Sequence, residues 1–343
     1  MTGHGPGRVR LQGWIEEKGN LLTQAAIERI VAEDPRRVTG FGGEFHLAWD
    51  ECTTTDRLGM LGIPGQFGII ACRGKTVGEI DPETPLISLE EAIRTAVRLR
   101  VATGAGAVTA LSGGVDSTLV AALAGLPCVT VGMEDSRDLE RGRDAARALG
   151  LPWEGVVLPE EVVESALPAV AAAVPRVTPL DVSIATGLFF VARWAGKKGY
   201  RRIITGQGAD ELFGGYARYR AATDIPAMLA RDFASLRGQC LRDQAVARLH
   251  GTAFSYPYLD LRVVRASHAI PPGGLIVAGT GKAPLRELAA RVIPPRFAAE
   301  PKKAMQYGSG IARAIRGLAR KNGYKGSVQR YLFRLTGDRD DLA

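Results

Sequence analysis

The segment Ser112-Gly113-Gly114-Val115-Asp116-Ser117 combines residue types that could bind a phosphate. The glycines let backbone N–H groups turn into the loop, and the serine hydroxyls can donate hydrogen bonds to phosphate oxygens. Asp116 would repel a phosphate unless a Mg²⁺ ion bridged the two. A glycine-rich turn that caps a helix is the alternative interpretation. No Gly-Lys-Ser/Thr triplet follows, so the loop differs from the Walker pattern of phosphate binding.

The elements around this loop favour the functional interpretation. A short apolar strand over 107–111 enters the loop, and a helix is expected after it. A second strand over 201–205 enters another glycine-rich segment, which carries Asp210. Ligands of open α/β sheets bind at the carboxyl ends of the strands. We therefore expect Asp210 to face Asp116, where the two carboxylates could hold Mg²⁺ on a pyrophosphate.

Short apolar strands alternate with helices from Ser88 onward, which predicts an α/β fold with a doubly wound parallel sheet. From Asp224 the sequence is mostly helical. The expected strands are 107–111, 127–131 and 201–205, and the expected helices are 89–102, 119–123, 139–149, 162–174 and 186–198.

Residues 1–85 have a different pattern. They suggest one helix over 22–32, with Thr23 as its N-cap, and short strands over 43–49 and 67–72. We expect three parts: a small β-containing segment over 1–85, a main domain over 86–336 and a tail over 337–343.

The composition narrows the class of protein. The 343 residues carry a net charge of +8, but no block of consecutive basic residues marks a nucleic-acid site. No apolar run reaches membrane-spanning length. None of the four cysteines forms a CxxC pair, so we expect neither a zinc site nor a disulfide framework, but reduced thiols in the cytoplasm. These cysteines are Cys52, Cys72, Cys128 and Cys240.

Longer matches point to one family. Ser112–Ser117 is similar to the SGGxDS loop of the PP-loop ATP pyrophosphatases, also called adenine nucleotide alpha hydrolases. The segment Gly206–Tyr216, GQGADELFGGY, resembles the GEGxDExFGGY segment of the asparagine synthetase C-terminal domain, which β-lactam synthetases share. The resemblance extends over about residues 88 to 320. Further matches in chain order are Val131–Leu139, Asp243, Tyr256–Asp260, Lys282–Arg286 and Pro301–Gly310.

The resemblance implies an AMP-forming ligase that uses ATP and Mg²⁺ to activate a carboxylate, and then forms an amide with an amine or ammonia. Synthesis of asparagine from aspartate is the specific reaction that the resemblance favours most. Asp116 and Asp210 would hold the metal, and Lys302 would be the catalytic lysine; by itself, Lys302 beside Lys303 would be a solvated basic pair. The residues expected to hold ATP are Leu111, Ser112, Gly113, Gly114, Asp116, Ser117, Val131, Gly132, Thr205 and Gly206.

Two departures from the family change the expected substrates. Thr2 stands where the family has its glutaminase nucleophile Cys, and residues 1–85, although Gly43–Asp50 resembles a glutaminase strand, are too few for that domain. We expect an inactive remnant, with nitrogen from ammonia, from a substrate amine or from a separate glutaminase. Gln207 stands where asparagine synthetases have Glu and β-lactam synthetases have Tyr. A neutral amide is no general base, so either the nucleophile or the proton acceptor differs.

Two other functions stay open. Related PP-loop enzymes adenylate bases in RNA, and the basic charge fits such a substrate. A non-catalytic ATP-binding partner is the other alternative, against which Asp116, Asp210 and Lys302 argue. The oligomeric state, a homo-oligomer included, is not readable from the sequence.

Overall fold

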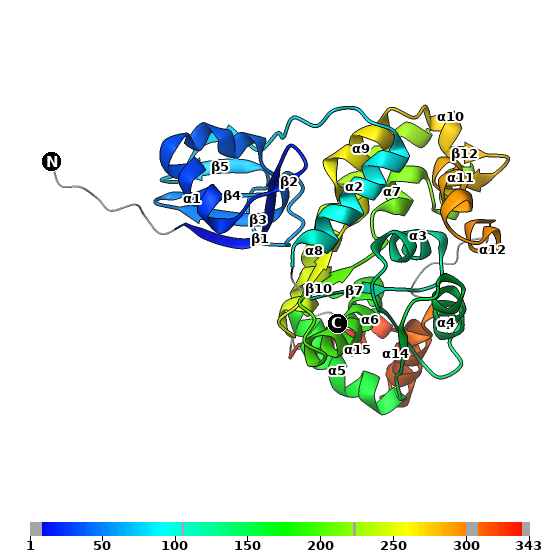
Figure 1. The fold of residues 1–343 in the computed structure, drawn as a ribbon. Helices are drawn as coiled ribbons and strands as arrows, with labels where there is room; N and C mark the ends of the chain where they lie inside the picture. The colour runs from blue at the N-terminus through cyan, green and yellow to red at the C-terminus, as the bar shows by residue number, and fades with distance from the viewer. Residues whose placement is uncertain (1–8, 105, 222–223, 300–307, 338–343) are drawn as a thin grey trace.

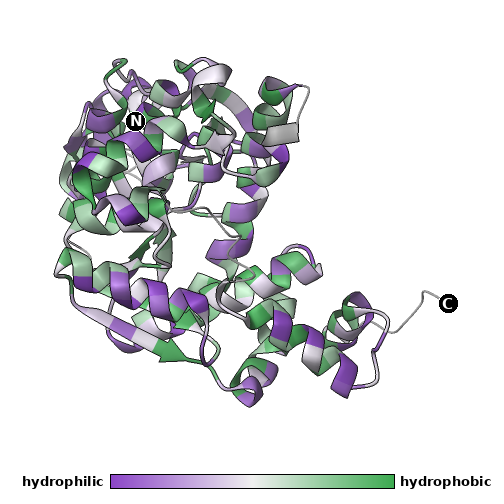
Figure 2. Ribbon diagram, turned by 90° about the vertical axis from the view of Figure 1, so that its right-hand side faces the viewer, coloured by the Kyte–Doolittle hydropathy of each residue, from purple (hydrophilic) through white to green (hydrophobic). Residues whose placement is uncertain are grey.

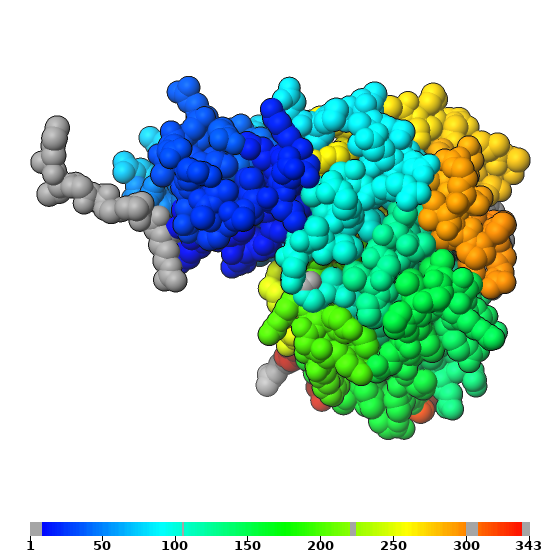
Figure 3. Space-filling model, in the orientation of Figure 1, coloured from blue at the N-terminus to red at the C-terminus, as the bar shows by residue number. Residues whose placement is uncertain are grey.

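The computed structural model describes residues 9–104, 106–221, 224–299 and 308–337. It contains an antiparallel sheet built from the N-terminal residues and a parallel sheet at the centre of the remaining chain (Figure 1). The N-terminal residues form a lobe beside the larger body of the molecule (Figure 3). Among the described helices, none combines the length and apolar character that a membrane crossing requires.

The N-terminal sheet has the order β2-β1-β3-β4-β5-β6, and all its neighbours are antiparallel. Helix α1 (Gln24–Glu33) begins at the predicted N-cap, where the Thr23 hydroxyl accepts a hydrogen bond from the Ala26 N–H. It packs Ile27 and Ile30 against the buried side of the sheet. The strands are β1 (Arg10–Glu17), β2 (Asn20–Leu21), β3 (Gly42–Trp49), β4 (Cys52–Thr55), β5 (Ile69–Cys72) and β6 (Lys75–Glu79), and the 3-10 helix η1 spans Pro35–Gly40.

The expectation of reduced thiols is wrong for two of the four cysteines. Cys52 in β4 lies directly opposite Cys72 in β5, with Cα atoms 4.0 Å apart, and the two form a disulfide. The pairing depends on strand register, which a spacing of 20 residues does not reveal. Cys128 and Cys240 are buried free thiols. The cytoplasmic location rested partly on the thiols and stays a prediction.

The central sheet confirms the predicted doubly wound topology. Its order is β11-β10-β7-β8-β9, and all pairs are parallel. The chain runs outward from β7 to β9, then crosses over to continue on the other side of β7. The order in which successive strands are added to the sheet therefore reverses between β7 and β10. Ligands of this architecture bind at such a switch point. The strands are β7 (Ala107–Ala110), β8 (Cys128–Gly132), β9 (Trp153–Val157), β10 (Arg202–Ile204) and β11 (Ala253–Ser255).

Helices cover both faces of the central sheet. Alternate strand residues point to opposite faces, so Val108 joins one core with α5, α6, α8 and α14, and Ala107 joins another with α2, α3, α4, α9 and α11. Hydrophobic and hydrophilic residues alternate along the outer helices (Figure 2). The long helices are α2 (Leu89–Ala102), α3 (Val115–Ala124), α4 (Arg137–Leu149), α5 (Glu160–Ala173), α6 (Pro179–Lys197), α8 (Ile225–Arg248), α9 (Leu261–His268), α11 (Ala283–Val292), α14 (Ile311–Lys321) and α15 (Val328–Leu335).

Shorter elements complete the C-terminal part, which is mostly helical as predicted. They are α7 (Ala209–Phe213), η2 (Ala217–Ala221), η3 (Pro257–Leu259), α10 (Pro272–Leu275), β12 (Ile276–Val277), β13 (Thr280–Gly281) and α12 (Pro295–Ala299).

Candidate functional site

The first loop, Ser112–Ser117, is closed on itself at the carboxyl end of β7. The Ser117 hydroxyl accepts a hydrogen bond from the Ser112 N–H (3.2 Å) and donates one to the Gly114 carbonyl (3.3 Å). Gly113 has φ +74°, and a Cβ there would lie 2.6 Å from backbone atoms of Arg141, so only glycine fits. Helix α3 starts immediately afterwards without a side-chain cap. Its N-terminal N–H groups are thus placed to bind an anion.

The second loop starts at Thr205 and meets the first. A Cβ on Gly206 would lie 2.9 Å from the Ser117 N and 3.0 Å from the Asp116 Cβ, which shows how closely the two backbones approach. Asp210 lies in the short helix α7, whose buried first turn follows this contact. The topology therefore brings the two predicted loops together at the switch point.

One buried lysine joins the two predicted carboxylates. The Lys282 Nζ lies 2.5 Å from the Asp116 Oδ2 and 2.6 Å from the Asp210 Oδ1, and its side chain is 1% exposed. Burial lowers the pKa of Lys282, and the Asp116 carboxylate opposes that shift. Gly215 makes room for the group, since a Cβ there would lie 1.9 Å from the Asp210 Oδ1 and 2.2 Å from the Lys282 Cε.

This arrangement fits Mg²⁺ brought by a nucleotide. The ammonium of Lys282 demonstrates that the position between Asp116 and Asp210 favours a cation. Within the described ranges no group of three or more His, Cys, Asp or Glu side chains could hold a metal alone. Mg²⁺ is commonly bound by one or two carboxylates together with substrate phosphates, and two carboxylates are what this site offers.

A cavity opens beside the two loops and extends towards α6 and α8. Its nucleotide end is lined by most of the residues expected to hold ATP: Leu111, Ser112, Gly114, Asp116, Ser117, Val131, Thr205 and Gly206. Gly113 and Gly132 do not line it, although both lie beside residues that do. The far end, towards α6 and α8, is lined by Ser183, Ile184, Gly187, Leu188, Val191, Gln207, Gln239, Arg242 and Asp243, and Phe254 and Ser309 also line the cavity. Such a two-ended cavity can hold a nucleotide next to a second substrate.

Gln207 is held by a chain of hydrogen bonds at the far end. Its Nε2 donates to the Gln239 Oε1, and the Gln239 Nε2 donates to the Glu211 Oε1 at 3.0 Å. The Tyr216 hydroxyl donates to the same oxygen of Glu211 at 2.6 Å. The Gln207 amide nitrogen is engaged with Gln239, so an amine would donate its hydrogen bond to the Gln207 carbonyl oxygen.

An ion-pair cluster that sequence reasoning missed borders the same end. Arg242 lies 3.1 Å from Asp181 in α6 and 2.7 Å from its neighbour Asp243. All three side chains are at most 10% exposed. Burial raises the pKa of Asp243, while Arg242 works against that rise. Asp243 belonged to a recognised motif, but nothing in the sequence pairs Arg242 with Asp181, because 61 residues separate them.

Lys302, Lys303 and Thr2 lie outside the described residues. The described end of the segment that carries Lys302 does reach the site. The Ser309 carbonyl accepts a hydrogen bond from the Met133 N–H at 2.8 Å, and Ser309 lines the cavity. The catalytic role of Lys302 stays a prediction.

Comparison with known proteins agrees with this geometry. A family model described as asparagine synthase matches residues 88–229 and 222–334. A Methanocaldococcus jannaschii protein, provisionally named as a glutamine-hydrolysing asparagine synthetase, is 31% identical over 256 residues, 62% of this chain and 47% of that protein. Carboxyethyl-arginine β-lactam-synthase of Streptomyces clavuligerus is 28% identical over 320 residues, 88% of this chain and 61% of that one.

Among solved structures, NMN synthetase from Francisella tularensis aligns with a TM-score of 0.38 at 14% identity, over 73% of this chain and 94% of that one. The matched part of the chain spans about half the length of the Methanocaldococcus jannaschii protein. Because the family model covers most of the residues, the chain belongs to the asparagine synthase family.

Proposed function

We propose that this protein uses ATP to convert a carboxylate into its acyl-adenylate, with release of pyrophosphate, and then transfers the acyl group to an amine or ammonia. The observation that carries the proposal is the convergence of Asp116 and Asp210, from two strand ends, on one cation position. The specific reaction that we favour is the formation of asparagine from aspartate. Its nitrogen would come from ammonia or a separate glutaminase.

In this proposal the nucleotide end neutralises developing negative charge. The loop Ser112–Ser117 and the N-terminus of α3 would bind phosphate oxygens, and Asp116 and Asp210 would hold Mg²⁺. When bound, the metal offsets charge on the phosphates as the bond to the leaving pyrophosphate breaks. Lys282 keeps a buried positive charge at the same place, where little water weakens its field. Lys302 is proposed as a second cation on the reacting groups.

The amide-forming step uses the other end of the cavity. Gln207 cannot remove a proton at neutral pH, so we assign it the orientation of the incoming amine through its carbonyl oxygen. Its fixed hydrogen bond to Gln239 supports that assignment, because an ordered acceptor reduces the entropy lost on alignment.

The test is carboxylate-dependent exchange of labelled pyrophosphate into ATP, measured over a panel of amino-acid and other small carboxylates. At least one carboxylate should stimulate exchange in the absence of RNA, and Asp210→Asn should abolish it. ATP binding without stimulation by any acid would instead favour a non-catalytic ATP-binding protein. Exchange that requires added RNA would favour base adenylation.

A further inference from the structure

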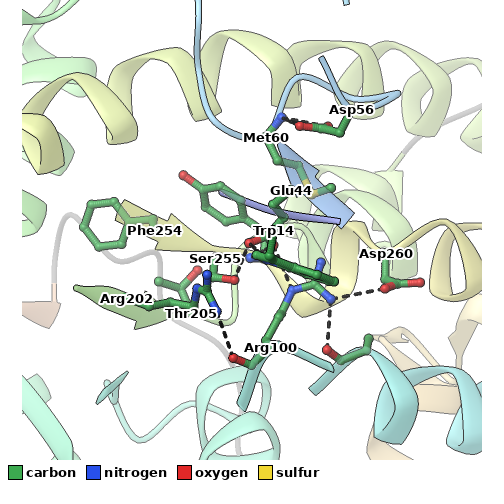
Figure 4. A network of polar contacts seen from close by, with 12 residues as sticks. Trp14, Glu44, Asp56, Met60, Arg100, Arg202, Thr205, Phe254, Ser255 and Asp260 are labelled. Atoms are coloured by element: carbon green, nitrogen blue, oxygen red, sulfur yellow. Dashed lines mark hydrogen bonds and ion pairs between the residues drawn. The ribbon is translucent and has the colours of Figure 1, made fainter. Parts of the chain in front are cut away.

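Glu44, in β3 of the N-terminal sheet, is a buried carboxylate in contact with the parallel-sheet body (Figure 4). Its Oε1 accepts hydrogen bonds from the Tyr256 N–H and the Arg100 Nε, both at 2.8 Å. Its Oε2 accepts from the Ser255 hydroxyl and, at 3.2 Å, from the Trp14 indole. Three of these four donors belong to the larger body, so the carboxylate joins the two parts of the chain.

The charges around Glu44 are matched to an ionised carboxylate. Burial would raise its pKa, but Arg100, Arg202 and the hydrogen bonds from Ser255 and Tyr256 outweigh burial and hold the pKa below its usual value. Arg100 also pairs with Asp260, at 3.1 Å. A buried charge that is paired and fully hydrogen-bonded holds the surrounding residues in one arrangement, because few alternative arrangements satisfy it.

The contacts of Glu44 lead directly to the second loop of the site. Ser255 is the last residue of β11 and pairs with Ile204 of β10. The Ser255 carbonyl accepts a hydrogen bond of 3.0 Å from the Thr205 N–H, and Thr205 is where the second loop starts. The Thr205 hydroxyl in turn accepts one of 3.4 Å from the Gln207 N–H. Glu44 thus holds the strand end to which this loop is attached (Figure 4).

A second set of contacts connects the N-terminal residues to α8. Gln244 donates to the Met60 carbonyl at 2.9 Å and to the Phe254 carbonyl at 2.7 Å. Arg248 donates to the Leu61 carbonyl at 3.0 Å. The same helix carries Gln239, Arg242 and Asp243 of the cavity, so two of the elements that line the cavity, α8 and β11, contact the N-terminal residues.

We propose that the N-terminal sheet is a positioning element for the acceptor end of the site, and that Glu44 is its principal positioning residue. The inference rests on the proposed ligase function, and it gives a role to residues that the sequence suggested to be an inactive remnant. Glu44 touches no expected substrate atom. It acts through Ser255 and Thr205 on the loop that carries Gln207 and Asp210.

The test compares Glu44→Gln with Glu79→Gln, a surface variant in β6 of the same sheet whose partner is Arg57. Glu44→Gln keeps the size of the side chain but presents an amide N–H₂ where one carboxylate oxygen accepted hydrogen bonds. Ser255→Ala, which removes only one hydroxyl, serves if Glu44→Gln fails to fold. All measurements are made well below the melting temperature of each variant.

Two readouts separate positioning from simple stabilisation. Amide hydrogen exchange over 205–212 should speed up about tenfold in Glu44→Gln, as loss of one buried hydrogen bond would allow, and stay unchanged over 112–118. In turnover, kcat for amide formation should fall about tenfold while the Kd for ATP stays within about twofold. Glu79→Gln should match wild type in both.

Each outcome decides the question. Wild-type exchange over 205–212 in folded Glu44→Gln or Ser255→Ala, with only the melting temperature lowered, would overturn the inference and leave the sheet a purely stabilising role. If no carboxylate supports turnover in the wild type, the ligase proposal fails, and hydrogen exchange still supports or refutes positioning of the loop by Glu44.

Discussion

Replacing Lys282 by methionine should lower the free energy of unfolding, and added Mg²⁺ should restore part of the loss. The side chain lies between Asp116 and Asp210 and is almost fully buried. Methionine fills a similar volume but leaves two carboxylates facing one another without their shared cation. The variant therefore has a vacant cation position where the wild type has an ammonium.

The magnitude follows from the two contacts. At about 2.6 Å and an effective dielectric constant of about 20, each carboxylate attracts the ammonium by roughly 6 kcal/mol before solvation is counted. Desolvation of the buried groups cancels much of this attraction, which agrees with the lowered pKa of Lys282. Removing one partner from a buried ion pair costs about 3–5 kcal/mol, and we expect a loss of unfolding free energy in that range without metal.

Urea unfolding in EDTA and in Mg²⁺ measures this effect. Mg²⁺ at a hundredfold excess over its Kd would return about 2.7 kcal/mol to the variant, whereas the wild type, whose site already holds Lys282, should gain less. Lys198→Met is the control, because its partner Glu154 is exposed and the loss should stay below about 1 kcal/mol. A loss from Lys282→Met that is the same with and without Mg²⁺ would refute the shared cation site.

Three further changes test other parts of the site. Gly215→Ala should lower stability by about 1–3 kcal/mol and reduce Mg²⁺-dependent ATP binding, because its Cβ would collide with Asp210; Gly238→Ala, in an open part of α8, should instead add about 0.5–1 kcal/mol, and urea unfolding compares the two. Gln207→Glu should raise ammonia-dependent asparagine formation, since a carboxylate can take the ammonia proton; efficient synthesis by the wild type would contradict this. Burial raises the pKa of Asp138 to about 6, against the pull of Arg141. The folded protein thus keeps a proton that the unfolded chain loses near pH 4, so this contribution of roughly 1–3 kcal/mol is complete below about pH 4 and is lost as the pH rises through 6. Asp138→Asn should flatten the unfolding free energy between these values, and an unchanged pH profile would exclude the assignment.

The sequence was most informative where local signals were strong. Helix α2 spans Leu89–Ala102 as predicted, because the Ser88 hydroxyl accepts from the Glu91 N–H and apolar residues recur at helical spacing. The strands β9 and β11 were not predicted. β9 has Glu154-Gly155 at its centre, and β11 has only three residues. Their sheet positions come from neighbouring strands and not from their own propensities.

The candidate site shows the same division. That Asp116 and Asp210 would meet followed from a rule of topology, which needs only the order of strands. That Lys282 would lie between them did not, because 166 residues separate it from Asp116 and its position is set by the packing around Gly215. The disulfide between Cys52 and Cys72 was missed for a related reason, since it depends on the register of β4 and β5.

Each end of the cavity pairs one buried cation with two carboxylates, and this pairing bears on the substrate. At the nucleotide end Lys282 lies between the two carboxylates, so a metal ion there would be bound together with the phosphates of a nucleotide. At the far end Arg242 is paired with Asp181 and Asp243, and the exposed Arg176 also lies 3.5 Å from Asp181. In that cluster the buried cation is already paired, and the carboxylate oxygens can accept further hydrogen bonds. We therefore expect a hydrogen-bond donor such as an amine at this end, and amino acids should stimulate pyrophosphate exchange more strongly than carboxylic acids without an amine.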